Sequence, residues 1–301
     1  IEGTNFTGSL LIGHNTTGTI SSAQYNTGVG IGALDALTTS DNNVAIGYNA
    51  GTAITTGKEN TLVGSGAGVS LTLGEKNVAI GKGALSTEDT GDKNVAIGHG
   101  ALQSANYDGS AYNVAIGFDA GVLVSTGTRN VIIGGAAGDA LATGSNNTAV
   151  GVFALSSETG GGKNTALGYG TLELQNVNAD GNNTAVGYIA GQTISTGVRN
   201  TIVGSQAGDV LTTGINNTFV GFNAGGAVTD RSYNTGVGDS ALGANVNGSK
   251  NVAVGNGTLA SMNPDSDLDT YNTALGYNAG LSVTTAINNT LIGAAAGDAL
   301  T

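Results

Sequence analysis

Apolar residues recur along the chain in short runs of three, and the runs follow one another with an almost constant 17-residue repeat. Every run after the first follows an Asn, and each run ends at a Gly, as in NVAIG from Asn43 and NTLVG from Asn60. The pattern occurs seventeen times, from a first coil that starts at Ser9 to a last one that starts at Asn289. A fixed short period is typical of a solenoid, in which each coil stacks on the one before.

Three coils are longer than the rest, namely those that start at Asn94, at Asn164 and, longest of all, at Asn251. The apolar runs are too short for helices and predict one short strand in each coil. The sequence therefore predicts an all-β fold, a parallel β-solenoid or β-roll of about 17 coils, with residues 1–301 forming a single repeat region. Because residue 1 is Ile and the last coil stops at Thr301, short of a full repeat, we expect a segment of a longer fibre protein.

Numbering each coil from its Asn, position 5 is Gly in all seventeen coils. A column that accepts only Gly indicates positive φ or close approach of a neighbouring backbone, because Gly alone lacks a Cβ. We therefore predict a structural corner at the end of each strand. These turn glycines are Gly13, Gly30, Gly47, Gly64, Gly81, Gly98, Gly117, Gly134, Gly151, Gly168, Gly187, Gly204, Gly221, Gly238, Gly255, Gly276 and Gly293.

The sizes of the side chains at positions 9 and 12 are correlated. Nine coils have Gly at position 9, and all nine have Ile, Leu or Val at position 12. Seven coils have Leu at position 9, and five of them carry a small or polar residue at position 12; Leu37 and Met262 are the exceptions. Since close packing tolerates neither voids nor overfilling, the exchange indicates one core volume that is filled from either position.

Positions 2 and 4 of each strand face one way and position 3 faces the other. Position 3 is also apolar, and a strand that is apolar on both faces is buried on both faces. One coil has only one interior, so we predict that position 3 packs against a neighbouring copy of the chain around a three-fold axis. The predicted interchain face comprises Leu62, Ile132, Ile202, Phe219 and Leu291.

Position 1 is Asn in sixteen coils. Stacked coils would place these amides about 4.8 Å apart, which allows a ladder of hydrogen bonds between side chains. Alternatively, each Asn bonds the backbone of its own turn. Both interpretations are structural, and the sequence leaves them open.

Composition removes several kinds of chemistry. The chain has 53 Gly, 1 Pro and no Cys, with a net charge of −12. The acidic balance disfavours nucleic acid as a partner, since phosphate binding depends on Lys and Arg. Without Cys there are no thiolate metal sites or thiol nucleophiles. The apolar runs are far shorter than the roughly 20 residues of a membrane helix, so we expect a chain that is not embedded in a membrane.

Candidate catalytic and ligand motifs fail in detail. GTAITTGK from Gly51 departs from a phosphate loop in its spacing and in the residue after the Lys. His14 and His99 share position 6 with Tyr and Phe residues, which favours surface or interface aromatics, or a stripe that stacks on sugar rings, over a metal pair. The run PDSDLD, with Asp265, Asp267 and Asp269, suggests either a Ca²⁺ site or, preferably, a solvated loop. We predict no catalytic residue, cofactor or metal, and no enzyme.

The unit N-[TV]-x-[VIL]-G-x-x-A-[GL], which TTG closes in many coils, resembles the NTAIGYNAG-type repeats of phage tail-fibre proteins. It is also similar to the head repeats of trimeric autotransporter adhesins, whose coils are typically shorter than those of this chain. The resemblance implies a homotrimeric structural fibre on a virion or an extracellular or cell surface, whose partners are copies of itself and a cell-surface glycan or receptor.

The leading functional hypothesis is therefore a fibre shaft or adhesin segment that presents a receptor-binding tip. A first alternative is an ice-binding or surface-layer β-solenoid, suggested by Thr pairs such as Thr55-Thr56, Thr212-Thr213 and Thr284-Thr285. A second alternative is a glycan-degrading β-helix tailspike, which would need paired carboxylates in a groove.

Overall fold

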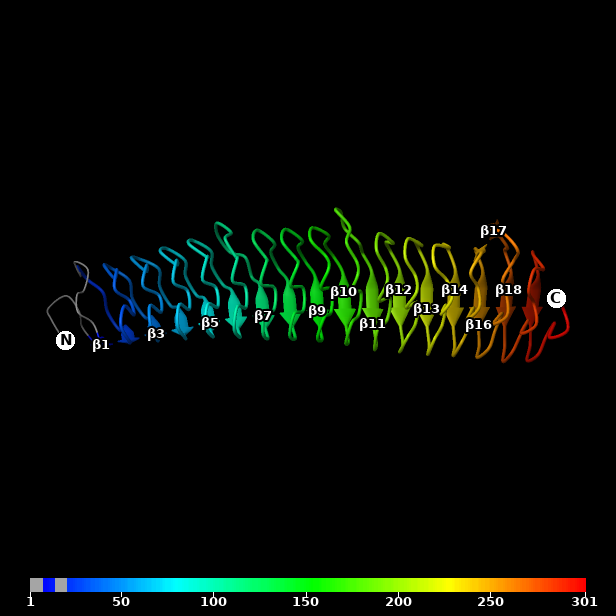
Figure 1. The fold of residues 1–301 in the computed structure, drawn as a ribbon, viewed down its shortest axis with the longest axis horizontal. Coiled ribbons are helices and arrows are strands. Elements are labelled where there is room, and N and C mark those ends of the chain that lie inside the picture. Colours follow the sequence, from blue (N-terminus) through cyan, green and yellow to red (C-terminus); the bar gives the residue numbers. More distant parts are fainter. Residues whose placement is uncertain (1–7, 14–20) are drawn as a thin grey trace. The chain divides into compact units, whose positions relative to one another are not determined.

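The computed structural model describes residues 8–13 and 21–301. Over these ranges the regular secondary structure consists of strands alone, joined by turns, with no helix. The chain divides into two compact units, residues 1–147 and 148–301. Each unit is a parallel β-solenoid in which one short strand from every coil joins a single sheet (Figure 1). The predicted fold class is confirmed.

The first unit contains eight described strands, each formed by an apolar triplet of the repeat. Each pairs in parallel with the next, and equivalent residues of successive coils lie opposite one another, as Val44 lies opposite Thr61. The strands are β1 (Leu10–Ile12), β2 (Thr27–Val29), β3 (Val44–Ile46), β4 (Thr61–Val63), β5 (Val78–Ile80), β6 (Val95–Ile97), β7 (Val114–Ile116) and β8 (Val131–Ile133).

The second unit repeats this arrangement and adds a two-stranded sheet, β15 (Gly248–Ser249) with β17 (Leu268–Asp269). The extra residues of the longest coil supply β17. The main strands of the unit are β9 (Thr148–Val150), β10 (Thr165–Leu167), β11 (Thr184–Val186), β12 (Thr201–Val203), β13 (Thr218–Val220), β14 (Thr235–Val237), β16 (Val252–Val254), β18 (Thr273–Leu275) and β19 (Thr290–Ile292).

The predicted interchain face is wrong, because position 3 lies in the interior of the chain's own coil. Leu62, Ile132, Ile202 and Phe219 have no solvent exposure, and Leu291 is partly buried against the same core. Positions 2 and 4 are the ones that stay half-buried or exposed in every described main strand. Alternation correctly separates the two faces of the strand, but it does not say which face points inward.

Large residues at position 3 occupy the interior space that glycines at position 9 leave free. A Cβ on Gly51 or Gly68 would lie 2.7 or 2.9 Å from a Cδ atom of Leu62. Each of the five large residues occurs where both its own coil and the preceding coil have Gly at position 9. The exchange between positions 9 and 12 therefore includes position 3, and the core is filled from three positions.

The predicted corners are confirmed. All seventeen position-5 glycines have positive φ, between 90° at Gly13 and 143° at Gly187. At Gly47, with φ of 136°, an added Cβ would lie 2.5 Å from the carbonyl oxygen of Gly64 in the next coil. Both conditions that exclude a side chain, positive φ and close backbone approach, therefore hold at this corner.

The Asn column makes both kinds of hydrogen bond that the sequence left open. Asn43 Nδ2 donates to Oδ1 of Asn26 (3.1 Å) and to the carbonyl oxygen of Gly57 (3.0 Å). Asn43 Oδ1 accepts from the backbone N–H of Asn60 in the next coil (2.9 Å). The column is buried from Asn26 to Asn272. Hydrogen bonds between its amides and the backbone of neighbouring coils therefore tie successive coils together.

Candidate interaction surface

The outer face of each sheet is formed by the first and third residues of its main strands. In the described main strands these positions hold only Val, Ile, Leu and Thr, so the face carries neither charge nor amide. Several of these side chains are well exposed, including Ile46 (41%) and Leu275 (48%). A contiguous exposed apolar surface of this kind is uncommon on soluble monomers and typically marks an interaction site.

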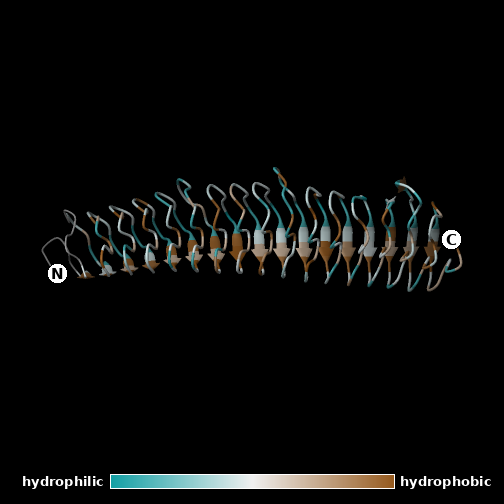
Figure 2. Cartoon of the chain, in the orientation of Figure 1, coloured by the Kyte–Doolittle hydropathy of each residue, from teal (hydrophilic) through white to brown (hydrophobic). Residues whose placement is uncertain are grey.

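The two units differ on this face. Strands β5 to β8 of the first unit read Val-x-Ile, whereas β9 to β14 of the second unit begin with Thr and end with Val or Leu. Figure 2 shows this difference, because strands β7 and β8 are hydrophobic throughout while strands β9 to β14 begin pale. Each Thr presents a methyl group and a hydroxyl, so the second unit offers a regular column of hydroxyls about 4.8 Å apart.

A column of aromatic side chains follows the corner glycines at position 6. Phe118 and Tyr188 are each more than half exposed. Rings of adjacent coils stack where both are present: His99 on Phe118 at 5.2 Å, and Tyr169 on Tyr188 at 5.6 Å between centroids. The predicted discontinuous aromatic stripe is therefore present. His14 lies outside the described residues, and Nδ1 of His99 is 3.3 Å from Oδ1 of Asp119.

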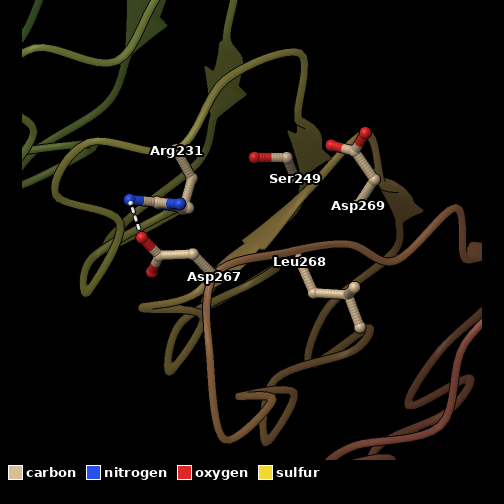
Figure 3. A pocket seen from close by; sticks show the side chains of 5 residues that line it. All are labelled: Arg231, Ser249, Asp267, Leu268 and Asp269. Carbon is tan, nitrogen blue, oxygen red and sulfur yellow. Dashed lines mark ion pairs between the residues drawn. The ribbon is translucent and has the colours of Figure 1, made fainter.

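The acidic run of the longest coil lines an open pocket formed by Arg231, Ser249, Asp267, Leu268 and Asp269 (Figure 3). Arg231 Nη2 lies 3.1 Å from Oδ2 of Asp267 and 2.6 Å from Oδ2 of Asp230. The hydrogen bond from Arg231 lowers the pKa of Asp230.

Asp267 and Asp269 both line this pocket, but each is engaged by a cation of the chain. Lys250 Nζ lies 2.7 Å from Oδ2 of Asp269, which raises the pKa of the Lys. Asp265 is exposed. Within residues 8–13 and 21–301 no three acidic or His side chains are grouped so that they could hold a metal ion. The arrangement favours the solvated loop over the Ca²⁺ site, because Asp267 and Asp269 each form an ion pair with a basic side chain.

Two buried carboxylates that the sequence analysis missed support the longer coils from Asn94 and Asn164. Glu88 Oε1 accepts from the backbone N–H of Asp89 (3.1 Å) and Gly91 (2.8 Å), and its Oε2 accepts from Tyr107 N (3.4 Å) in the longer coil. Burial raises the pKa of the Glu88 carboxyl, and its backbone hydrogen bonds oppose that shift.

Glu158 has the same role in the second unit. Its Oε1 accepts from Gly160 N (3.2 Å) and Gly161 N (2.7 Å). Its Oε2 accepts from Gln175 Nε2 (3.1 Å) and from the Val177 backbone N–H (3.2 Å) in the longer coil. The available signal was a Glu at position 12 in each of the two coils that directly precede those from Asn94 and Asn164.

Comparison with protein-family models, with curated proteins and with solved structures gives no match for this chain. Within the ranges that the structure covers, no helix is long and apolar enough to cross a bilayer. The geometry of the surface therefore carries the functional argument.

Proposed function

We propose that the chain is a structural fibre shaft or adhesin segment that assembles laterally into a homotrimer and presents a receptor-binding tip on a virion or cell surface. The resemblance of its repeats to tail-fibre and adhesin repeats is the reason for proposing three chains per particle and a location on a virion or cell surface. The interchain face in this proposal is the outer face of the sheet, positions 2 and 4, instead of position 3.

The observation that carries the proposal is the outer face itself, which presents only Val, Ile, Leu and Thr side chains and no charge on every described main strand. Burying apolar surface contributes about 25 cal/mol per Å², so a face that repeats with every coil gives a large driving force for association. A second copy of the chain has the same coil spacing and can therefore match the face along its length. Closed cyclic symmetry lets every copy bury the face equally.

The test is the mass of the particle in solution, measured by light scattering after size-exclusion chromatography. We expect three times the chain mass of 29.2 kDa. The double variant Ile46→Lys, Ile80→Lys places two charges on the outer face and should shift the particle to monomer with an unchanged β-sheet circular dichroism spectrum. The control is Leu73→Lys, since Leu73 is 52% exposed but lies outside the strands. A wild-type particle of 29.2 kDa at all concentrations contradicts the proposal.

One observation favours a second candidate, an ice-binding or surface-layer β-solenoid. The first strand position in the second unit is Thr in β9 to β14, β18 and β19, which is a more regular array than the Thr pairs considered from the sequence. Regular hydroxyls and methyls on a parallel sheet could order water at an ice surface. A thermal-hysteresis assay discriminates: activity that is lost in Thr201→Lys but kept in Val95→Lys would favour this candidate.

A further inference from the structure

The last residue of each coil, which directly precedes the position-1 residue of the next, forms a second exposed column beside the sheet. We call it the pre-strand column; it runs from Tyr25 to Asn288 at the same repeat position. Its sixteen residues are four Tyr, five Asn, four Lys, two Arg and one Glu. None of them is buried. Their side chains therefore do not serve the core.

Every residue of the pre-strand column has positive φ, between 50° at Asn182 and 62° at Tyr233 and Lys250. This left-handed conformation strains any residue with a Cβ, although Asn tolerates it better than most. Gly would adopt it freely. Yet in a chain that contains 53 glycines, Gly holds the equivalent place only once, at Gly8 before the first coil (φ 64°), and nowhere from Tyr25 to Asn288.

Two other columns of the same coils show what left-handed backbone alone selects here. Position 7 has positive φ in each described coil from Gly32 to Ala295, and six of its sixteen residues are Gly. Position 9 also has positive φ and alternates between Gly and a buried Leu such as Leu34, which fills the core. The pre-strand column therefore keeps strained, exposed side chains where neither the backbone nor the core requires them, and such strain points to a function.

The charge of the column is opposite to that of the chain. It holds six of the nine cations, namely Lys76, Lys93, Arg129, Lys163, Arg199 and Lys250, against a net charge of −12 for the whole sequence. Within each unit these cations recur at every coil or after a few coils, which places close neighbours about 5–10 Å apart. The column thus holds most of the chain's cations, three of which are paired with carboxylates: Lys76 with Glu75 (3.5 Å), Lys163 with Asp180 (2.6 Å) and Lys250 with Asp269 (2.7 Å).

Neighbouring members of the column contact one another across coils. Lys93 Nζ lies 4.9 Å from the ring centroid of Tyr112 and 3.1 Å from its hydroxyl oxygen, and these contacts lower the pKa of the Tyr. Lys250 and Tyr271 repeat the geometry at 5.1 and 3.1 Å. Arg199 Nε donates to Oδ1 of Asn216 (3.0 Å). The column therefore contains two sites at which a Lys is held against a Tyr ring, with Asn, Lys and Arg at most of its other positions.

We infer that the pre-strand column is a binding track for an anionic polysaccharide. Tyr rings provide flat apolar faces for sugar rings, Asn amides bond hydroxyl groups, and Lys and Arg bind the carboxylate or sulfate groups. Nucleic acid is disfavoured, because no two Tyr residues of the column lie in adjacent coils and successive bases therefore have no continuous platform to stack on. An anionic polysaccharide would be the ligand class of the adhesive role proposed above. The binding track rests on that proposed role only for its location, a virion or cell surface on which such a polymer occurs.

The test compares binding of fluorescently labelled polygalacturonate, heparin, neutral dextran and single-stranded DNA to the intact chain at low and at moderate salt. We expect binding to one or both anionic polysaccharides that weakens with salt; polygalacturonate alone would identify carboxylates and heparin alone sulfates as the recognised groups. Failure to bind either polysaccharide, or equal affinity for DNA, overturns the inference.

The decisive variant is Lys93→Gly with Arg129→Gly. Because Gly relieves left-handed strain, the thermal midpoint should stay the same or rise, while affinity should fall about tenfold or more as two charge-assisted contacts are lost. The control is Lys82→Gln, which removes an exposed cation outside the column. An equal loss in the control, or a loss of folding together with binding, contradicts the inference. A monomer that still binds would defeat only the trimer, and a trimer that does not bind would defeat only the track.

Discussion

The two units of the chain are alike inside and different outside. In both, positions 3, 9 and 12 share one core volume, as at Leu62 with Gly68 in the first unit and Ile202 with Gly208 in the second. On the outer face, strands β5 to β8 of the first unit present Val and Ile, whereas β9 to β14 of the second present Thr in place of the first Val. The interior is constrained by close packing that changes little between the units. The residues of the outer face are instead constrained by the solvent or the partner molecule that contacts them.

Val and Thr have nearly the same shape, but they are not equivalent at an interface. Burying a Thr hydroxyl without a hydrogen-bond partner costs free energy, whereas burying a Val methyl contributes it. The outer face of strands β5 to β8 in the first unit is therefore better suited to a dry contact with another copy of the chain. The face of the second unit is suited to a contact that includes water or polar partners.

The largest effect is expected from the corners, where the two units should respond alike. Gly47→Val and Gly204→Val each place a Cβ within 2.5 Å or less of a carbonyl oxygen in the next coil, Gly64 and Gly221 respectively, at a φ that Val resists. Neither variant should give folded, soluble protein. The measurement is soluble yield and the circular dichroism spectrum.

Gly66→Ala is the control for the corner variants. Gly66 also has positive φ, at 68°, but an added Cβ meets nothing within 4 Å. We expect a loss of only about 1 kcal/mol from backbone strain. If a corner variant folds normally in one unit only, the interiors of the two units are not equivalent.

A smaller loss of stability is expected from core variants, and here the two units should respond differently. Leu62→Ala should cost about 2–5 kcal/mol by leaving a cavity. Adding Gly68→Leu should recover part of that loss, because it recreates the Leu at position 9 with a small position 3 that seven other coils use. In the second unit, Gly208→Leu should not rescue Ile202→Ala, since Phe219 Cδ2 would lie 3.2 Å from the new Cβ.

Chemical denaturation of the four variants measures this difference. Additive losses at Leu62 and Gly68, with no recovery in the double variant, would show that positions 3 and 9 do not share one volume. Recovery in both units would show that the ring of Phe219 yields more readily than its position suggests.

The sequence predicts the strands and corners well, because apolar triplets and invariant glycines report local backbone geometry. It misassigned the interior, because alternation is symmetric between the two faces of a strand. The size rule would have resolved this: Leu62 and Phe219 are large only where their own coil and the preceding coil both have Gly at position 9. The outer face and the pre-strand column were beyond reach, since exposure and φ at Arg129 depend on how coils stack.

The smallest expected effect concerns the buried carboxylates, and it distinguishes the units again. Burial raises the pKa of Glu88 above its ordinary value of 4.5. The folded state therefore holds the proton more tightly than the unfolded one, and this contribution to stability is present at low pH and lost as pH rises through the folded pKa. Gln at position 88 does not titrate, so the Glu88→Gln variant does not lose this stabilisation as the pH rises. The stability of this variant relative to wild type should rise between pH 4 and pH 7.

Gln suits position 88 better than position 158, for a geometric reason. At Glu88 one oxygen accepts the two shorter bonds, and the other accepts only the 3.4 Å contact from Tyr107 N. At Glu158 each oxygen accepts from two donors. Glu158→Gln would turn an NH₂ group toward two donors and should lower stability at pH 7, since a lost buried hydrogen bond costs about 1–3 kcal/mol. The measurement is the free energy of unfolding in urea of wild type and both variants at pH 4 and at pH 7. A Glu88→Gln variant whose stability relative to wild type is the same at both pH values would show that the Glu88 carboxyl does not titrate differently on folding.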